Sequence, residues 1–187
     1  MTNLVVTPKV AAVIASDEGV VLEAYKDSVG IWTWGVGVTD TSGHRVGRYK
    51  DNPQTIQRVM EIFMWLLETK YAPAVRCAFK GVELTEAQFA AALSFHYNTG
   101  AISRAAWVRH YVSGNTSKAR KAIMSWSRAG NDPNALRSRR LREQALFFEG
   151  RWHGGGMATI YPVLKPSYQP DFGRGKRVNI LPLIGQQ

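Results

Sequence analysis

Cysteine and long apolar runs are almost absent from this chain of 187 residues. The single cysteine, Cys77, excludes an intramolecular disulfide and a cluster of cysteine metal ligands. The longest strongly apolar stretch near the start, Val10–Ile14, is far shorter than the about 20 residues that a membrane-spanning helix needs. The opening MTNLVVTPK also lacks the basic start, apolar run and cleavage site of a signal peptide. We therefore expect a soluble protein made inside the cell, without stable membrane insertion.

Acidic residues are scarce in the second half of the chain. The net charge is +10, and 45% of the residues are hydrophobic, which excludes global disorder. Residues 1–103 hold nine basic and ten acidic side chains, residues 104–153 hold eleven and three, and residues 154–187 hold four and one. This asymmetry predicts a face that attracts an anionic polymer. Nucleic acid and an anionic cell-wall polysaccharide both fit, and a basic surface without a partner is the third interpretation.

The residue pattern predicts an α+β fold whose strands are clustered near the N-terminus. β-Branched and aromatic residues punctuated by glycines over Val20–Thr39 are typical of a small hairpin or meander. Apolar residues at helical spacing predict helices elsewhere, and the alanine-rich helix that Thr85 and Gln88 open with a capping box should be buried at the centre. The predicted helices are Pro8–Ala15, Thr55–Tyr71, Glu86–Tyr97, Ser103–Ser113, Ser117–Arg128 and Asn134–Gly150.

Residues 154–187 have a different composition, rich in proline, glycine and tyrosine and without helical periodicity. We expect a domain over residues 1–153, with residues 154–187 as a C-terminal extension packed on it. Its recurrent apolar residues, among them Ile160, Val178 and Ile180, predict a buried structural role. The specific expectation is an extended strap that packs against the last helices and carries no catalytic group.

Three polar residues stand out at the end of the first helix and in the predicted hairpin: Glu18, Asp27 and Thr33. A hairpin folded back over the helix end would bring them to one wall of a cleft. Hydrolysis of a glycosidic bond needs a carboxyl group to protonate the leaving oxygen, a carboxylate to activate water and a hydroxyl to help hold that water. The spacing alone is also compatible with three helix-capping and surface groups.

The surrounding residues resemble a known signature. Eight residues separate Glu18 from Asp27, five separate Asp27 from Thr33, and Gly35-Val36-Gly37 follows. This pattern is similar to the active-site signature of the T-even-type phage lysozymes, glycoside hydrolase family 24. The segment Ser94–Gly100 resembles the family's Ser-Phe-x-x-Asn-x-Gly segment. Residues 137–147 resemble its C-terminal Arg-Arg-x-x-Glu-x-x-Leu-Phe helix, so the likeness covers about residues 9–153.

The resemblance implies a lysozyme-like fold, mainly helical with a small β-hairpin or meander near the N-terminus. It implies a muramidase, a phage endolysin that hydrolyses the β-1,4 bond between N-acetylmuramic acid and N-acetylglucosamine. Glu18 is then the general acid, Asp27 with Thr33 activates the water, and the anomeric carbon is inverted. Because both proton donor and acceptor are side chains, no cofactor is expected, and the spacing of the four histidines predicts no metal site. Three further residues are expected to bind substrate: Trp32 beside Thr33, Asn98, and Arg139, which could approach Glu18.

We expect a monomer whose partners are peptidoglycan and the anionic cell envelope, with no specific nucleic acid. It should wait in the host cytoplasm until a separate holin-type pore releases it to the cell wall. Two alternatives are a lytic transglycosylase on a lysozyme-like fold, which uses one acid and no water-activating carboxylate, and a basic nucleic-acid-binding protein. Asp27 and Thr33 argue against the former, and only the net charge of +10 favours the latter.

Overall fold

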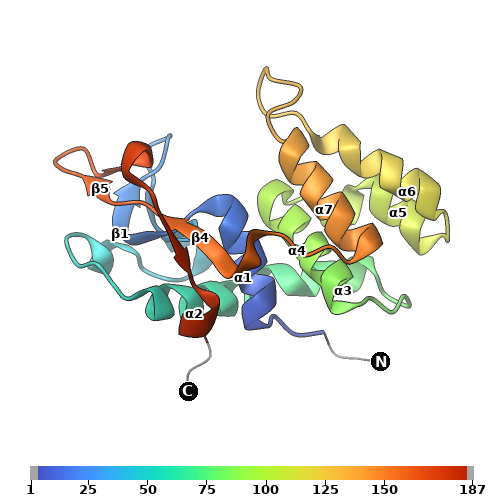
Figure 1. Cartoon of the computed structure of the whole chain (residues 1–187), viewed down its shortest axis with the longest axis horizontal. Helices are drawn as coiled ribbons and strands as arrows, with labels where there is room; N and C mark the ends of the chain where they lie inside the picture. The colour runs from blue at the N-terminus through green and yellow to red at the C-terminus, as the bar shows by residue number, and fades with distance from the viewer. Residues whose placement is uncertain (1–3, 185–187) are drawn as a thin grey trace. The chain divides into compact units, whose positions relative to one another are not determined.

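The computed structural model describes residues 4–184, so the expectations about residues 1–3 and 185–187 lie outside it. The chain forms two compact units. One, here called the β unit, consists of residues 7–66 and, among the described residues, 154–184. The other, the helical unit, consists of residues 67–153 together with residues 4–6. In Figure 1 the β unit takes the blue-to-teal part of the chain and the deep orange-to-red part that follows α7, so its two segments come from opposite ends of the sequence.

The β unit opens with helix α1, Pro8–Glu18. Thr7 caps it by accepting a hydrogen bond from the Val10 amide, and Pro8 occupies the first turn, where its missing N–H costs nothing. Residues Val10–Ala15 are all buried, so the helix is a core element rather than an amphipathic surface helix. Helix α2, Ile56–Leu66, packs against it within the same unit.

Three short antiparallel strands follow α1, as the sequence predicts. Strand β1 is Val21–Lys26, β2 is Trp32–Gly35 and β3 is Val38–Thr39, hydrogen-bonded in that order. The register pairs Tyr25 with Thr33 and Lys26 with Trp32 across β1 and β2. Strand β1 is therefore at one edge of this sheet, with its second edge open to another partner.

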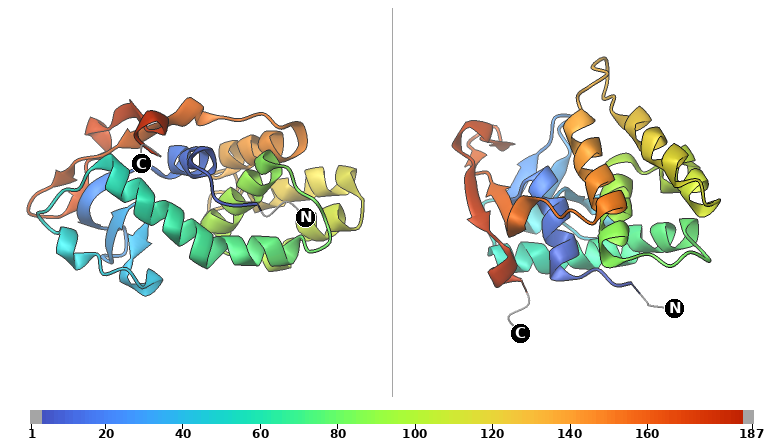
Figure 2. Two further views of the ribbon diagram at one scale, coloured as in Figure 1. Left: turned by 90° about the horizontal axis from the view of Figure 1, so that it is seen from below. Right: turned by 45° about the vertical axis from the view of Figure 1, so that its right-hand side comes forward.

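Over residues 154–184, the C-terminal extension packs beside that edge without adding a strand to the sheet. Its four strands are β4, Met157–Ile160, β5, Val163–Leu164, β6, Gln169–Pro170, and β7, Lys176–Asn179, paired as β4 with β7 and β5 with β6. Strand β4 packs against α1, and β5 and β6 pack against β1, an arrangement that can be followed in Figures 1 and 2.

The expected strap over the last helices is therefore wrong. The extension belongs to the same compact unit as α1 and β1. The physical reason is backbone hydrogen bonding at the two ends of β1: Val20 exchanges two bonds with Thr159 and Tyr161, and the Lys26 amide donates to the Tyr168 carbonyl. A helix face offers side chains alone. The Pro/Gly-rich composition gave no periodicity because these strands are two to four residues long.

The helical unit is built around α4, Glu86–Thr99. The capping box of Thr85 and Gln88 is present as predicted, and every residue from Phe89 to Phe95 is buried. Helix α4 packs against α7, Arg137–Glu149, and rings from both helices meet Trp107 in the core. The remaining elements are the π-helical turn Leu67–Tyr71, α3 Ala72–Ala78, α5 Ala106–Val112 and α6 Thr116–Ala122.

The predicted helices are confirmed with shifted ends. Helix α1 continues three residues past Ala15 to Glu18, and α4 continues to Thr99, where Gly100 with φ of 62° caps it. Helices α5, α6 and α7 are each shorter than predicted. Among the described residues, none of the helices has the length and apolar character needed to cross a membrane.

Candidate active site

Glu18 is the last residue of α1 and is exposed. The helix ends there because Gly19 follows with φ of 79°, a conformation that favours glycine, and its amide closes the helix on Ala15. A Cβ at Gly19 would lie 2.7 Å from the Tyr161 ring of the extension. The backbone directly after Glu18 is therefore fixed both by the helix stop and by a close approach to the extension.

Asp27 directly follows β1 and holds the hairpin turn together. Its Oδ1 accepts hydrogen bonds from the backbone amides of Val29 and Ile31, at 3.0 and 2.9 Å. The Asp27 amide in turn donates to the Ile31 carbonyl at 3.0 Å. This side-chain-to-backbone pattern is typical of turn-forming aspartates. Among residues 4–184 no hydrogen bond to Oδ2 is recorded, so one carboxylate oxygen builds the turn and the other is available to a ligand.

Thr33 lies in the middle strand, β2, paired with Tyr25 on one side and Thr39 on the other. It is 3% exposed, and its hydroxyl donates to the Ile31 carbonyl at 3.1 Å. A hydroxyl has one proton and two lone pairs, so this bond uses the donor and leaves acceptor capacity. Toward a neighbouring water, the Thr33 hydroxyl can therefore act as an acceptor.

Tyr25 joins the predicted residues and was missed in the sequence. Tyr25 and Thr33 are paired across β1 and β2 and therefore share a face of the sheet, and Asp27 follows Tyr25 by two residues, just past the end of β1. Burial raises the pKa of the Tyr25 phenol to about 12, with further contributions from the charges of Asp27 and Glu18. Both carboxylates thus act on one phenol, which stays protonated and able to donate. The register that pairs Tyr25 with Thr33 identifies it.

Trp32 and Trp34 share the opposite face of β2 from Thr33, because they lie two residues apart. Trp34 is fully buried and stacks on Tyr49 with ring centroids 4.0 Å apart, so it belongs to the core. Trp32 is half-buried and contacts Tyr168 of the extension and the Lys26 and Lys50 ammonium groups. A substrate contact of Trp32 stays a prediction.

Asn98 and Arg139 belong to the helical unit, where both are part of a buried polar network. Arg139 Nε lies 3.2 Å from Glu143 Oε1, Arg140 Nη2 lies 3.1 Å from the same oxygen, and Ser94 donates to it. Arg140 also donates to Asn98 Oδ1 at 2.7 Å. Burial raises the pKa of Glu143, and the two guanidinium groups oppose that rise. The network joins α4 to α7, and the proposed approach of Arg139 to Glu18 stays a prediction.

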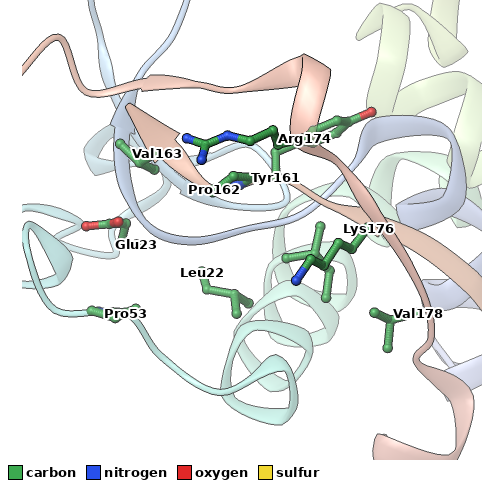
Figure 3. A pocket seen from close by; sticks show the side chains of 10 residues that line it. Leu22, Glu23, Pro53, Tyr161, Pro162, Val163, Arg174, Lys176 and Val178 are labelled. Atoms are coloured by element: carbon green, nitrogen blue, oxygen red, sulfur yellow. The ribbon is translucent and has the colours of Figure 1, made fainter. Parts of the chain in front are cut away.

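A separate hollow lies between β1 and the extension. Its volume is about 580 Å³, and Figure 3 shows Leu22 and Glu23 on one side and Tyr161, Arg174 and Lys176 on the other. The lining is mainly apolar and does not include Glu18, Asp27 or Thr33. The hollow shows that the extension shapes the surface next to the strand that leads to Asp27.

Comparison with known proteins identifies the family of this chain. The phage lysozyme family model matches residues 15–143. The endolysin of Salmonella phage P22 is 34% identical over 136 residues, which are 70% of this chain and 89% of that protein. A solved structure of a mutant P22 lysozyme has a TM-score of 0.68 and 29% identity, covering 78% of this chain and 99% of that one. The endolysin of Escherichia coli O157:H7 phage FAHEc1 has a TM-score of 0.69 and 25% identity, covering 81% and 98%.

The chain belongs to the phage lysozyme family. It is therefore a glycosidase of the lysozyme type that acts on peptidoglycan, with the lysozyme-like α+β fold that the sequence predicts. The predicted endolysin class is confirmed, and neither a lytic transglycosylase nor a nucleic-acid-binding protein is favoured. The matched range contains Glu18, Asp27 and Thr33, whereas residues 154–187 lie outside it.

Proposed function

We propose that this lysozyme is an inverting muramidase in which Glu18 is the general acid and Asp27 the general base. The observation that supports this most strongly is the hairpin itself. It fixes Asp27 through Oδ1, leaves Oδ2 to a ligand, and places Thr33 and Tyr25 on the same face. A carboxylate held in this way can accept a proton without having to move.

The water is proposed to lie between Asp27 and Thr33. One of its protons bonds to Asp27 Oδ2 and the other to the Thr33 hydroxyl, whose own proton is held by Ile31. The water then donates one hydrogen bond to each of these two acceptors, and this orientation turns a lone pair of its oxygen toward the anomeric carbon. Transfer of one proton to Asp27 as the C–O bond forms is general base catalysis, and inversion follows from attack on the opposite face.

Glu18 is proposed to protonate the leaving oxygen on the other face of the sugar. The exposed position at the end of α1 makes its carboxyl group accessible to a large polymeric substrate. Tyr25, which both carboxylates act on electrostatically, is proposed to stabilise their charges as a neutral donor. Asn98 and Arg139 are proposed as substrate-binding positions. Trp32 is proposed either to contact the sugar or to support Thr33 from the opposite face of β2.

The same proposal covers the domain organisation of the enzyme and its route to the cell wall. Residues 1–153 form the catalytic domain and residues 154–187 its extension. The enzyme acts as a monomer, needs no cofactor, and reaches the wall through a holin-type pore. The basic side chains of residues 104–187 steer it toward the anionic envelope, since a positive field raises the encounter rate with a polyanion.

The test uses two matched variants, Glu18→Gln and Asp27→Asn. Glutamine keeps the shape of Glu18 without the proton to donate, so lysis of permeabilised cells should fall at least about 100-fold. Asparagine keeps an oxygen that can accept from Val29 and Ile31, so the turn should survive while the base is lost. Both variants should melt at the wild-type temperature. Near-wild-type lysis by either would refute the corresponding role.

A further inference from the structure

The two proposed catalytic carboxylates are joined by one short segment. Glu18 ends α1, Gly19 and Val20 follow, and β1 then leads directly to Asp27. The separation and relative orientation of the two carboxylates therefore depend on how this segment is held. One edge of β1 is bonded to β2. The other edge meets the C-terminal extension, which lies outside the matched range of the lysozyme family.

The extension bonds this segment at both of its ends. At the Glu18 end, the Val20 amide donates to the Thr159 carbonyl at 2.8 Å, and the Tyr161 amide donates to the Val20 carbonyl at 2.9 Å. At the Asp27 end, the Lys26 amide donates to the Tyr168 carbonyl at 2.7 Å. Each contact is within two residues of a catalytic carboxylate in the sequence.

Tyr168 makes a second contact, with the other arm of the hairpin. Its ring meets the Trp32 ring edge-on, with centroids 5.2 Å apart and an interplanar angle of 71°. Trp32 is paired with Lys26 and directly precedes Thr33. Tyr168 thus touches the residue before Asp27 through its carbonyl and the residue before Thr33 through its ring.

Tyr168 is itself anchored. Its hydroxyl donates to Asp51 Oδ2 at 2.8 Å, and the Lys165 ammonium bridges Asp51 and Glu23 at 2.5 and 2.8 Å. Glu23 lies on β1, so the anchor returns to the same strand. The hydrogen bond from Lys165, aided by that from Tyr168, holds the pKa of Asp51 below its usual value.

We propose that the extension positions the two catalytic carboxylates, and that Tyr168 is the positioning residue for the Asp27–Thr33 turn. This rests on the proposed roles of Glu18 and Asp27. Tyr168 acts through Lys26 and Trp32 and touches neither the sugar nor the water. Misplacement of a catalytic group by about 1 Å can lower the rate about 100-fold, so a modest loosening of the turn is enough to reduce turnover.

Tyr168→Gly is the informative variant. Tyr168 has φ of 60°, a conformation that glycine adopts without strain, so the substitution keeps the backbone and its carbonyl acceptor while removing the ring. Tyr168→Phe is the matched control, because it retains the ring contact with Trp32 and loses the hydroxyl. On purified peptidoglycan we expect Tyr168→Gly to lower kcat about 10- to 100-fold with KM nearly unchanged, and Tyr168→Phe to stay within about threefold.

Amide hydrogen exchange gives an independent readout in the same samples. The Val29 and Ile31 amides bonded to Asp27 should exchange faster in Tyr168→Gly, whereas the α4 amides should not change. Wild-type kcat for Tyr168→Gly, or a raised KM with kcat unchanged, would overturn the proposal. If that variant does not fold, Tyr168→Asn supplies the test, because asparagine also tolerates a positive φ and lacks the ring, and a wild-type kcat there overturns the proposal as well. Full activity of Glu18→Gln would instead refute the proposed function, whatever Tyr168→Gly does.

Discussion

At the scale of single residues, the site depends on which atoms of Asp27 and Thr33 are already bonded. Asp27 uses Oδ1 for the turn, and Thr33 uses its proton for Ile31. What remains, a carboxylate oxygen and hydroxyl lone pairs, is a pair of acceptors. Such a pair suits a water molecule, which has two protons to donate. Asp27 can therefore both form the turn and act as the proposed base, because the two roles use different carboxylate oxygens.

Tyr25 offers a test of the electrostatics of the site. Its pKa of about 12 in the folded protein lies above the ordinary value of about 10, so the folded state binds the phenolic proton more tightly than the unfolded state. The stability that this provides is fully present below about pH 10 and is lost as pH rises toward about 12. Tyr25→Phe has no proton to lose. Urea unfolding at about pH 9 and about pH 11 should therefore show a steeper loss in the wild type, by about 1–2 kcal/mol.

The comparison of wild type with Tyr25→Phe also controls for the other titrating groups. Other tyrosines and the lysines titrate in both proteins, so the difference between wild type and Tyr25→Phe isolates one phenol. Equal pH slopes in the two proteins would mean that folding does not raise the pKa of Tyr25, either by burial or through the charges of Asp27 and Glu18.

At the scale of elements, the contact between α1 and the extension is predicted to limit which residue can follow Glu18. Gly19→Ala has two costs: a positive φ that alanine resists, and a Cβ 2.7 Å from the Tyr161 ring. Gly43→Ala is the control for a positive φ without a contact, since its φ of 86° is similar and nothing lies within 4 Å of the added Cβ. Its ψ of 6° differs from the 166° of Gly19, which adds to the backbone cost of Gly19→Ala. We expect Gly43→Ala to lower the free energy of unfolding by about 1–2 kcal/mol and Gly19→Ala by about 1–3 kcal/mol more.

Chemical denaturation of the two variants measures this difference directly. If both lose the same stability, the close approach of Tyr161 to Gly19 contributes nothing and the extension is not packed against the end of α1.

The elements also show how far the sequence could be read. Helix starts were readable where a cap marks them, as at Thr7 and Thr85. The proposed roles of Glu18, Asp27 and Thr33 came from the resemblance to the lysozyme family, because their spacing alone also fitted capping and surface groups. The packing of the extension was not readable, because its strands are too short to show alternation and its partner is the far-away edge of β1. Tyr25 was missed because only the strand register shows that it is paired with Thr33, and the register cannot be read from the sequence.

At the scale of the whole molecule, the uneven charge predicts a salt-dependent rate. Residues 104–187 hold fifteen basic and four acidic side chains, and exposed charges attract a polyanion less as ionic strength screens them. Lysis of permeabilised cells at limiting enzyme should slow several-fold between about 0.01 M and about 0.2 M salt. An unchanged rate would show that the excess charge does not guide the enzyme to the wall.

The central claim, acid–base hydrolysis with inversion by Glu18 and Asp27, is tested most directly by the configuration of the first product. Proton NMR of purified peptidoglycan during the first minutes of digestion by the wild-type enzyme distinguishes the anomers before they equilibrate. Cleavage of a β-linkage by water attacking from the opposite face must release the α-anomer of the new reducing end. The account predicts the α-anomer. A β-anomer would indicate retention through a covalent intermediate, and an anhydro-sugar would indicate a transglycosylase; either result contradicts it.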